Sequence, residues 1–320
     1  MHWPIRTKTV SLLLLASVAP LCVSAWLDIR ESRERLITAT SDLLAARADH
    51  LADQLDVFHR RYQNLARIAS ELPAVRGLFQ PGSVAVESTK SRVHEALKAW
   101  PEHDPNIRGV GVIGKDGTVV AATESPLIGV NVSKRSHIQE SLKARQVISN
   151  IFVAQPEVGN QPTIAYLSPV FVKGKTEGIA VIWVRASALW SVMKKSNELA
   201  GSKSYAVLFD QQGIRIGHTY SDEILFHPGG RLDPQLIDAL VAEGRFGAKT
   251  RELLEDVREF PEQFARARSG NPDLGMFRGF APVNQLWNFG VARRFETVPW
   301  TIFYMVPEDH TLARVSAVTK

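Results

Sequence analysis

Histidine and cysteine are the residue types in this sequence that could most directly ligate a metal ion or attack a substrate, and neither has a catalytic spacing. The nine histidines are scattered, and His94 and His103 lie nine residues apart across Pro101, which gives no metal geometry without further ligands. The sequence has no HExxH pair, no Gly-x-Ser-x-Gly elbow and no glycine-rich phosphate loop after a predicted strand. We therefore expect no enzyme activity, no metal site and no cofactor in this chain.

The composition is that of a folded protein, since 45% of the 320 residues are hydrophobic and 22% are charged. This length predicts two domains, or one elongated domain with a helical stalk. A single cysteine excludes an internal disulfide framework. The 38 basic and 33 acidic residues leave a net charge of +5 that is spread along the chain, so we expect no nucleic-acid partner.

The N-terminal segment predicts a membrane anchor. Residues 9–27 contain no charged side chain, and as a helix they would span nearly 30 Å, about the thickness of a bilayer core. Basic residues within 1–8 precede this stretch and acidic residues follow it, which places the N-terminus in the cytoplasm. The alternative is a secretory signal peptide cleaved near residues 23–25 (Val-Ser-Ala). The length of the apolar run and the helical pattern after it favour an uncleaved anchor.

Residues 28–72 predict one long amphipathic helix. They contain neither proline nor glycine before Leu72, and at 1.5 Å per residue they would extend about 70 Å. Apolar residues recur at spacings of three and four, and they are Leu51, Leu55, Phe58, Tyr62, Leu65, Ala69 and Leu72. We interpret this helix as a stalk that continues the anchor and packs along the domain that it carries.

After a shorter helix at about 84–100, the pattern changes to strands. The turn Gly114-Lys-Asp-Gly117 joins two apolar runs, as expected for a hairpin. A short helix follows at about 136–145, and three more apolar runs come after the hairpin. The sequence predicts a five-stranded, largely antiparallel sheet with helices on one face, built from strands at 107–113, 118–122, 147–154, 163–171 and 178–185.

The same pattern repeats 96 residues later. Gly117 aligns with Gly213 and Thr123 with Thr219, each at the end of a similar strand and turn. Further on, the Ser-Pro-Val at 168–170 is echoed by the Ala-Pro-Val at 281–283. The repeat predicts a second, smaller sheet module with strands near 290–295 and 300–305 and a helical insert at about 234–268. The expected fold is therefore α+β, with a long N-terminal helix carrying two tandem antiparallel sheet modules at 73–198 and 199–312.

This organisation resembles the double Cache domains, in which two PAS-like modules form the extracytoplasmic sensor of bacterial histidine kinases, chemoreceptors and diguanylate cyclases. The resemblance covers residues 36–312. It depends on the order of the elements and on three motifs, namely the turn ending at Gly117, Arg135 before the first short helix and the Ser-Pro-Val strand at 168–170. In that family a second membrane span follows the sensor, and we take residues 313–320 as the junction to a span that this sequence does not include.

The resemblance implies that a small ligand binds in the first, membrane-distal module, between the sheet and the short helix. Arg135 matches the family arginine, whose guanidinium would hold a carboxylate through two hydrogen bonds. His137 and Ile138 replace the aromatic pair that amino-acid-binding members use with an aspartate to hold an ammonium group. The sequence has no aspartate between Asp116 and Asp210, and Glu157 is a possible substitute or a solvated loop residue.

The departure from the family pattern favours a carboxylate or another anion over an ordinary α-amino acid. Phe152, Tyr166 and Trp183 lie on predicted strands that could line the pocket, so the candidate site consists of Arg135, His137, Phe152, Tyr166 and Trp183. Each of them has an alternative interpretation, as a surface residue for Arg135 and His137 and as a core residue for the three aromatics.

The expected function is a ligand-binding sensor domain of a membrane-anchored bacterial receptor. We expect it in the inner membrane with the sensor in the periplasm, as a homodimer whose stalk helix relays the binding event. The alternative is an anchored or secreted solute-binding or adaptor protein without an output of its own.

Overall fold

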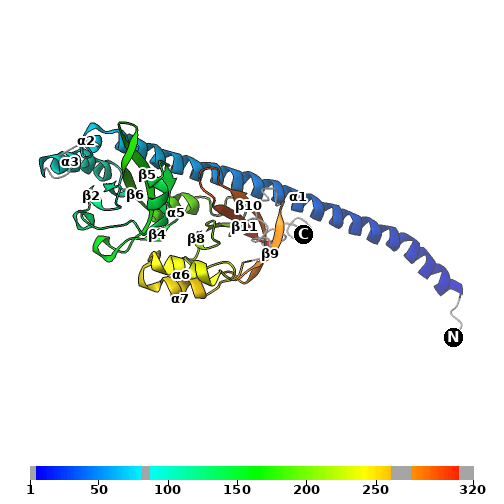
Figure 1. Cartoon of the computed structure of the whole chain (residues 1–320). Coiled ribbons are helices and arrows are strands. Elements are labelled where there is room, and N and C mark those ends of the chain that lie inside the picture. Colours follow the sequence, from blue (N-terminus) through cyan, green and yellow to red (C-terminus); the bar gives the residue numbers. More distant parts are fainter. Residues whose placement is uncertain (1–4, 81–86, 261–274, 310–320) are drawn as a thin grey trace.

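The computed structural model describes residues 5–80, 87–260 and 275–309, with the side chains of residues 5–15 and of residue 87 excepted. Its largest element is helix α1 (Ile5–Glu71), which runs for 67 residues from the segment predicted as an anchor into the segment predicted as a stalk (Figure 1). Within the described residues, no helix has a stretch long and hydrophobic enough to cross a bilayer. The predicted span at 9–27 begins among the residues whose side chains are not described, and the predicted junction at 313–320 lies outside the described residues.

The C-terminal half of α1 packs along both sheets of the protein (Figure 1). The predicted apolar seam is confirmed: Leu51, Leu55, Tyr62 and Ala69 are buried, and the other three seam residues pack partly buried against the same core. A helix with one apolar face must bury that face to be stable, so the seam determines which side of α1 contacts the sheets.

The distal module begins with α2 (Pro73–Gly77) and α3 (Glu87–His103), and its sheet has six strands rather than the five predicted. The strands are β1 (Ile107–Gly114), β2 (Val119–Ala122), β3 (Val147–Ile148), β4 (Phe152–Val153), β5 (Pro162–Val172) and β6 (Lys175–Arg185). They form an antiparallel sheet in the order β2-β1-β6-β5-β3, and β4 also pairs with β5. The predicted strand at 147–154 is split because the Ser149 hydroxyl accepts a hydrogen bond from the Ala165 amide, and the next two residues turn toward the second module.

Helix α1 covers one face of the distal sheet, and α4 (Ser136–Leu142) covers the other with η1 (Ser125–Leu127) and η2 (Pro156–Val158). Apolar side chains on both faces are therefore buried. The second face carries a separate apolar cluster that includes Ile113, Ile138, Phe152 and Trp183. This is the face on which the candidate site lies.

Helix α5 (Ala186–Lys194) leads to the proximal sheet, which has five strands in the order β8-β7-β11-β10-β9. They are β7 (Tyr205–Phe209), β8 (Arg215–His218), β9 (Phe277–Ala281), β10 (Leu286–Arg294) and β11 (Thr301–Pro307). The predicted helical insert contains α6 (Pro234–Ala242), η3 (Gly247–Lys249) and α7 (Thr250–Glu255), while its part at 261–268 lies outside the described residues.

The two hairpins of the predicted repeat have matching geometry. Gly117 and Gly213 adopt φ angles of 82° and 84°, which favour glycine at both turns. The Thr123 hydroxyl accepts from the Val110 amide at 3.0 Å, and the Thr219 hydroxyl accepts from the amide of Ala206, also at 3.0 Å. The proposed echo at 281–283 is wrong, because 168–170 lie inside β5 and the equivalent strand by sheet order is β10, whereas 281–283 form the end of β9 and the turn after it.

Candidate functional site

A small hollow, here called the distal pocket, lies between the distal sheet and α4, on the face away from α1. Its volume is about 30 Å³, which is room for one or two water molecules. A larger ligand would therefore need the segment from η1 to α4 to move outward. The pocket is lined by Arg108, Ile113, Val119, Leu127, Val132, Arg135, His137, Ile138, Phe152, Ala154, Gln155, Val158 and Trp183.

Arg135 sits at the N-terminal end of α4, where its extended backbone starts the helix and its carbonyl accepts a hydrogen bond from the Ile138 amide at 3.1 Å. Its half-buried guanidinium lies 4.4 Å from the centre of the Phe152 ring, a cation–π contact. Burial lowers the pKa of Arg135, and nearby Glu243 acts in the opposite direction. Among the residues that the structure describes, no group forms an ion pair or a side-chain hydrogen bond with this guanidinium. Its donors are therefore available to a ligand.

His137 lies two residues further on, in the first turn of α4, and its ring stacks on Phe152 at 5.4 Å with an interplanar angle of 18°. Burial lowers the pKa of His137 to about 3, and the positive charges of Arg135 and Arg245 add to this effect. The imidazole is therefore neutral at physiological pH, so Arg135 carries the positive charge at this end of α4.

The wall of the distal pocket also includes one member of a largely buried ion pair that the sequence analysis missed. Arg108 on β1 forms a salt bridge of 3.1 Å with Glu124, and its guanidinium lies 5.6 Å from the Trp183 ring centre. Within the described structure, the Arg108 Nε and one Glu124 carboxylate oxygen have no hydrogen-bond partner. A Cβ on Gly109 would come within 2.8 Å of that oxygen, so this glycine makes room for the carboxylate. A charged residue inside an otherwise apolar strand was the signal that could have identified Arg108.

The structure brings four of the five predicted site residues together and places the fifth elsewhere. Arg135, His137, Phe152 and Trp183 all line the distal pocket. Tyr166 lies on the opposite face of the sheet, where its hydroxyl is 2.8 Å from Nδ1 of His59 on α1. Because side chains alternate along β5, Ala165 and Leu167 face the pocket cluster and Tyr166 faces the stalk helix. Glu157 is exposed on η2.

A second, larger hollow lies between the two modules, and we call it the inter-module cavity. Its volume is about 370 Å³. Arg135, His137 and Phe152 form part of its wall as well as part of the distal pocket. The proximal module contributes Gln211, Gln212, Leu236, Ala239, Leu240, Glu243, Arg245, Pro299 and Trp300, and the segment at 147–150 and residues 136 and 140 complete it.

Arg245, in the connection after α6, joins the two modules beside this cavity. Its guanidinium forms a buried ion pair with Asp210 and a hydrogen bond with the Gln212 side chain, and it donates to the backbone oxygen of Ile151 at 3.1 Å. The Arg245 carbonyl accepts a hydrogen bond from the Val153 amide at 2.8 Å. The proximal module therefore holds the segment that joins β3 to β4 in place through hydrogen bonds to Ile151 and Val153.

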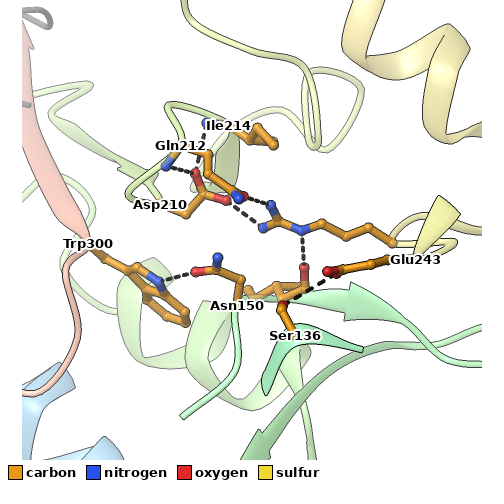
Figure 2. Close-up of polar contacts among 9 residues, drawn as sticks. Ser136, Asn150, Asp210, Gln212, Ile214, Glu243 and Trp300 are labelled. Atoms are coloured by element: carbon orange, nitrogen blue, oxygen red, sulfur yellow. Dashed lines mark hydrogen bonds and ion pairs between the residues drawn. The ribbon is translucent and has the colours of Figure 1, made fainter. Parts of the chain in front are cut away.

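Trp300 makes the second contact of this kind, since its indole Nε1 donates to Asn150 Oδ1 at 2.9 Å (Figure 2). Trp300 is buried, and its ring lies 5.0 Å from that of His59 on α1. The segment at 150–153 thus contacts the proximal module on one side, and through Phe152 it lines the distal pocket. A displacement of Phe152 would act directly on the interface between the modules.

Neither a protein-family model nor a curated protein matches this chain. Solved structures do. The sensor domain of the Vibrio cholerae histidine kinase DctB aligns with a TM-score of 0.67 and 14% identity, over 85% of this chain and 98% of that one. The ligand-binding domain of the Campylobacter jejuni chemoreceptor Tlp3, solved in complex with L-norvaline, aligns with a TM-score of 0.60 and 16% identity, over 87% of this chain and 94% of that one.

These similarities show the fold: the chain consists of a long helix and two PAS-like modules, as predicted, and the sensor domains that it resembles are of the double Cache type. The neighbours are sensor and ligand-binding domains rather than catalytic domains, in agreement with the expectation that the chain is not an enzyme.

Proposed function

We propose that this chain is the extracytoplasmic sensor domain of a membrane-anchored bacterial receptor and that it binds a small molecule bearing a carboxylate or a similar anionic group at Arg135. The observation that carries the proposal is the half-buried guanidinium of Arg135, which stacks on Phe152 with no protein counter-ion among the described residues. Leaving such a group without partners is costly, so a ligand anion that pairs with it gains a charge-assisted, two-pronged interaction.

The balance of charge in the distal pocket supports an anionic ligand group. Two arginines, Arg108 and Arg135, line this pocket without an acidic residue among the other lining side chains, and Glu124 beside it is already paired with Arg108. His137 adds no charge because burial keeps it neutral. Glu157, the acid considered from the sequence, is exposed and does not face the pocket.

In this proposal the packing of α1 against both modules transmits the effect of ligand binding. Ligand binding moves the segment carrying Arg135 and Phe152, and that segment is hydrogen-bonded to the proximal module through Ile151 and Asn150. Both sheets pack on α1 (Figure 1). A ligand that prefers one arrangement of the modules would shift the population toward it and displace α1 along or around its axis. In this proposal residues 9–27 anchor the helix in the inner membrane, and two stalk helices pair in a homodimer.

Thermal unfolding of the 320-residue chain with a panel of small carboxylates tests the binding site. A ligand at a hundred times its Kd stabilises the folded state by about 2.7 kcal/mol, which moves the midpoint measurably. We expect Arg135→Gln to abolish this shift. The matched control is Arg145→Gln, in the exposed turn after α4, where the side chain is 72% exposed. A carboxylate shift that persists in Arg135→Gln, or that disappears equally in Arg145→Gln, would contradict the proposed site.

A further inference from the structure

We infer that the proximal module binds a ligand of its own, a small aromatic acid, in a pocket on the face of its sheet that points away from α1. This hollow, here called the proximal pocket, is lined by Glu198, Lys203, Tyr205, His218, Tyr220, Val283, Asn284, Leu286 and Pro307. Its volume of about 420 Å³ lies within the usual range for small-molecule sites. It shares no lining residue with the distal pocket or the inter-module cavity, so the inference does not depend on the function proposed above.

Two buried ring residues of the hairpin formed by β7 and β8 line this pocket. Tyr205 begins β7 and packs with Met305, whereas the next residue, Ala206, belongs to the core beneath α1. Because side chains alternate along a strand, Tyr205 lies on the face opposite the stalk helix. His218 ends β8 on the same face, and its ring centre lies 5.4 Å from that of Tyr205.

The Tyr205 hydroxyl provides one donor for a ligand. The residue is only 3% exposed, and its hydroxyl has no hydrogen-bond partner among the residues that the structure describes. Burial raises the pKa of Tyr205, so the hydroxyl keeps its proton at neutral pH. Leaving a buried donor unpaired is costly, and a ligand oxygen that accepts from this hydroxyl would remove the cost.

His218 provides a second donor. Its Nδ1 accepts hydrogen bonds from the backbone amides of Tyr220 at 3.2 Å and Ser221 at 3.0 Å, so the proton of the neutral ring is on Nε2. Burial lowers the pKa of His218 to about 3, which keeps the ring neutral at physiological pH. In the described part of the chain, no group accepts from Nε2. The two turn amides therefore fix the ring and leave its N–H for a ligand.

A buried positive charge close to these two rings favours an anionic group over a neutral one. The guanidinium of Arg215 on β8 is buried and donates to the backbone oxygens of Arg258 at 3.0 Å and His227 at 3.4 Å. No carboxylate pairs with it among the described residues, and its charge acts on both rings. Glu198 and Lys203 are exposed charges of opposite sign, which water screens, so they change this balance little.

The rest of the lining favours an aromatic body. The ring of Tyr220 lies 5.9 Å from that of Tyr205, so three rings line the pocket together with His218. The aliphatic part of the lining consists of Val283, Leu286 and Pro307. Aromatic rings attract a further ring through offset or edge contacts, beyond the gain from burying apolar surface. A molecule such as benzoate matches this lining, with its carboxylate on the Tyr205 hydroxyl and on Nε2 of His218.

The two donors are specific to the proximal module. In the hairpin repeat, which relates the modules by an offset of 96 residues, Tyr205 corresponds to Gly109 and His218 to Ala122. Neither of those residues has a polar side chain, so the distal hairpin carries neither donor. The proximal pocket therefore has a chemistry of its own and is not a copy of the distal site.

The test is isothermal titration calorimetry with benzoate. It uses the 320-residue chain both as wild type and as Arg135→Gln, so that an acid bound in the distal module is recognised. Two matched probes separate the features of the ligand: cyclohexanecarboxylate keeps the acid without the aromatic ring, and benzamide keeps the ring without the charge. In Arg135→Gln we expect benzoate to bind about threefold or more tightly than cyclohexanecarboxylate. We expect it to bind about tenfold or more tightly than benzamide.

Substitutions in the Arg135→Gln background locate the site. Tyr205→Phe removes the unpaired hydroxyl and should weaken benzoate binding about tenfold, while the unfolding midpoint should not fall because the hydroxyl has no partner to lose. His218→Asn keeps an acceptor for the two turn amides but removes the Nε2 donor, and it should weaken benzoate similarly. The control is Tyr166→Phe, which removes a buried hydroxyl on the α1 face of the distal sheet and should leave the benzoate affinity unchanged.

The outcomes separate this inference from the proposed function. Benzoate that binds the wild type but not Arg135→Gln would belong to the distal module, which would overturn the proximal site and leave the proposed function standing. Binding to Arg135→Gln that survives both Tyr205→Phe and His218→Asn, or that falls equally in Tyr166→Phe, would overturn the site as well. Equal affinities for the three probes would contradict an aromatic acid as the ligand. Benzoate that binds neither chain would overturn the inference, and the test of Arg135 with the carboxylate panel would be unaffected.

Discussion

The guanidinium of Arg245 in the proximal module donates a hydrogen bond of 3.1 Å to the backbone oxygen of Ile151 in the distal module. Ile151 directly precedes Phe152, on which the Arg135 guanidinium is stacked. One peptide unit therefore connects the Phe152 ring, on which Arg135 lies, to the buried Arg245–Asp210 ion pair of the proximal module. This connection determines which substitutions should affect the fold and which should affect signalling.

The buried Arg245–Asp210 pair should contribute far more to stability than an exposed pair. Replacing Arg245 with methionine leaves the Asp210 carboxylate buried without its counter-ion and leaves the Ile151 oxygen without its donor, so we expect a loss of about 3 kcal/mol or more. Urea unfolding measures it. Arg251→Met, which removes two exposed ion pairs, should cost less than about 1 kcal/mol. Similar losses for the two variants would contradict the role of Arg245 as a joint between the modules.

Trp300→Phe should loosen the same joint while keeping an aromatic ring against His59. The substitution removes the hydrogen bond to Asn150 and leaves that amide oxygen unpaired, at a cost of about 1–3 kcal/mol. The unfolding midpoint in urea gives the change. Trp287→Phe, at a ring that is 47% exposed, serves as the comparison and should leave the midpoint nearly unchanged.

His59 should make the protein less stable in mild acid. Burial lowers the pKa of His59 to about 4, with Asp56 opposing, so in the window from pH 6.5 down to 4 the unfolded chain binds a proton here that the folded protein does not. Stability therefore falls as the pH falls, by about 2 kcal/mol between pH 7.5 and 5 for this residue. His137 and His218 act in the same direction, since burial lowers the pKa of each to about 3.

The contribution of His59 can be isolated from the slope of stability against pH rather than from its absolute value. Unfolding free energies at pH 7.5 and 5 should differ less in His59→Gln than in the wild type. His103→Gln, at an exposed position of α3, should leave the difference unaltered. An unchanged difference in His59→Gln would mean that the pKa of this histidine is the same in the folded and the unfolded protein, which would contradict the prediction.

Gly178 should not tolerate a side chain. A Cβ there would lie 2.5 Å from the backbone oxygen of Ile113 and 2.3 Å from the ring of Phe79, so Gly178→Ala should destabilise the distal sheet by about 1–3 kcal/mol. Gly77→Ala is the matched control, because nothing lies within 4 Å of its Cβ position and helix α2 favours alanine. Calorimetric melting of both variants checks the contrast. Equal midpoints would argue against the close packing of β6 on β1 and Phe79.

The proposed homodimer can be tested on the exposed side of the stalk. Val57 is 61% exposed and Ile68 43% exposed on α1, and Val57 borders a groove with α5 of about 540 Å³. If a second stalk covers this side, Val57→Glu should shift sedimentation from dimer to monomer. Gln54→Glu, a polar position in the same groove, should shift it less. A wild-type chain that sediments as a monomer at all concentrations would contradict the dimer.

Several elements followed from the sequence because their signals are local. The seam of α1 depends on spacings of three and four residues, and the paired hairpins depend on Gly117 and Gly213, whose positive φ angles few other residues adopt as readily. Arg135 and His137 were found through a resemblance to a motif at one helix end, and Phe152 was chosen because it lies on a predicted strand. The three residues lie within 18 positions of one another.

The face to which Tyr166 belongs could not be determined from the sequence. Strand β5 is buried on both sides, so its residues show no alternation of polar and apolar types. Which of its side chains point toward α1, Tyr166 among them, is set by the pairing of β5 with β6 and by the packing of the stalk. From the sequence alone, Tyr166 is compatible both with a pocket residue and with a core residue, and the assembled sheet makes it a core residue.

Only the tertiary structure brought Arg135, Glu243 and Arg245 around one cavity. The sequence by itself determined the long helix, the two modules and an arginine suited to an anion, because each depends on neighbours within a few turns or one hairpin. The inter-module cavity depends on contacts between segments about a hundred residues apart, such as Ile151 with Arg245 and Asn150 with Trp300. No local pattern encodes such pairs, since packing of both modules against α1 decides which side chains meet.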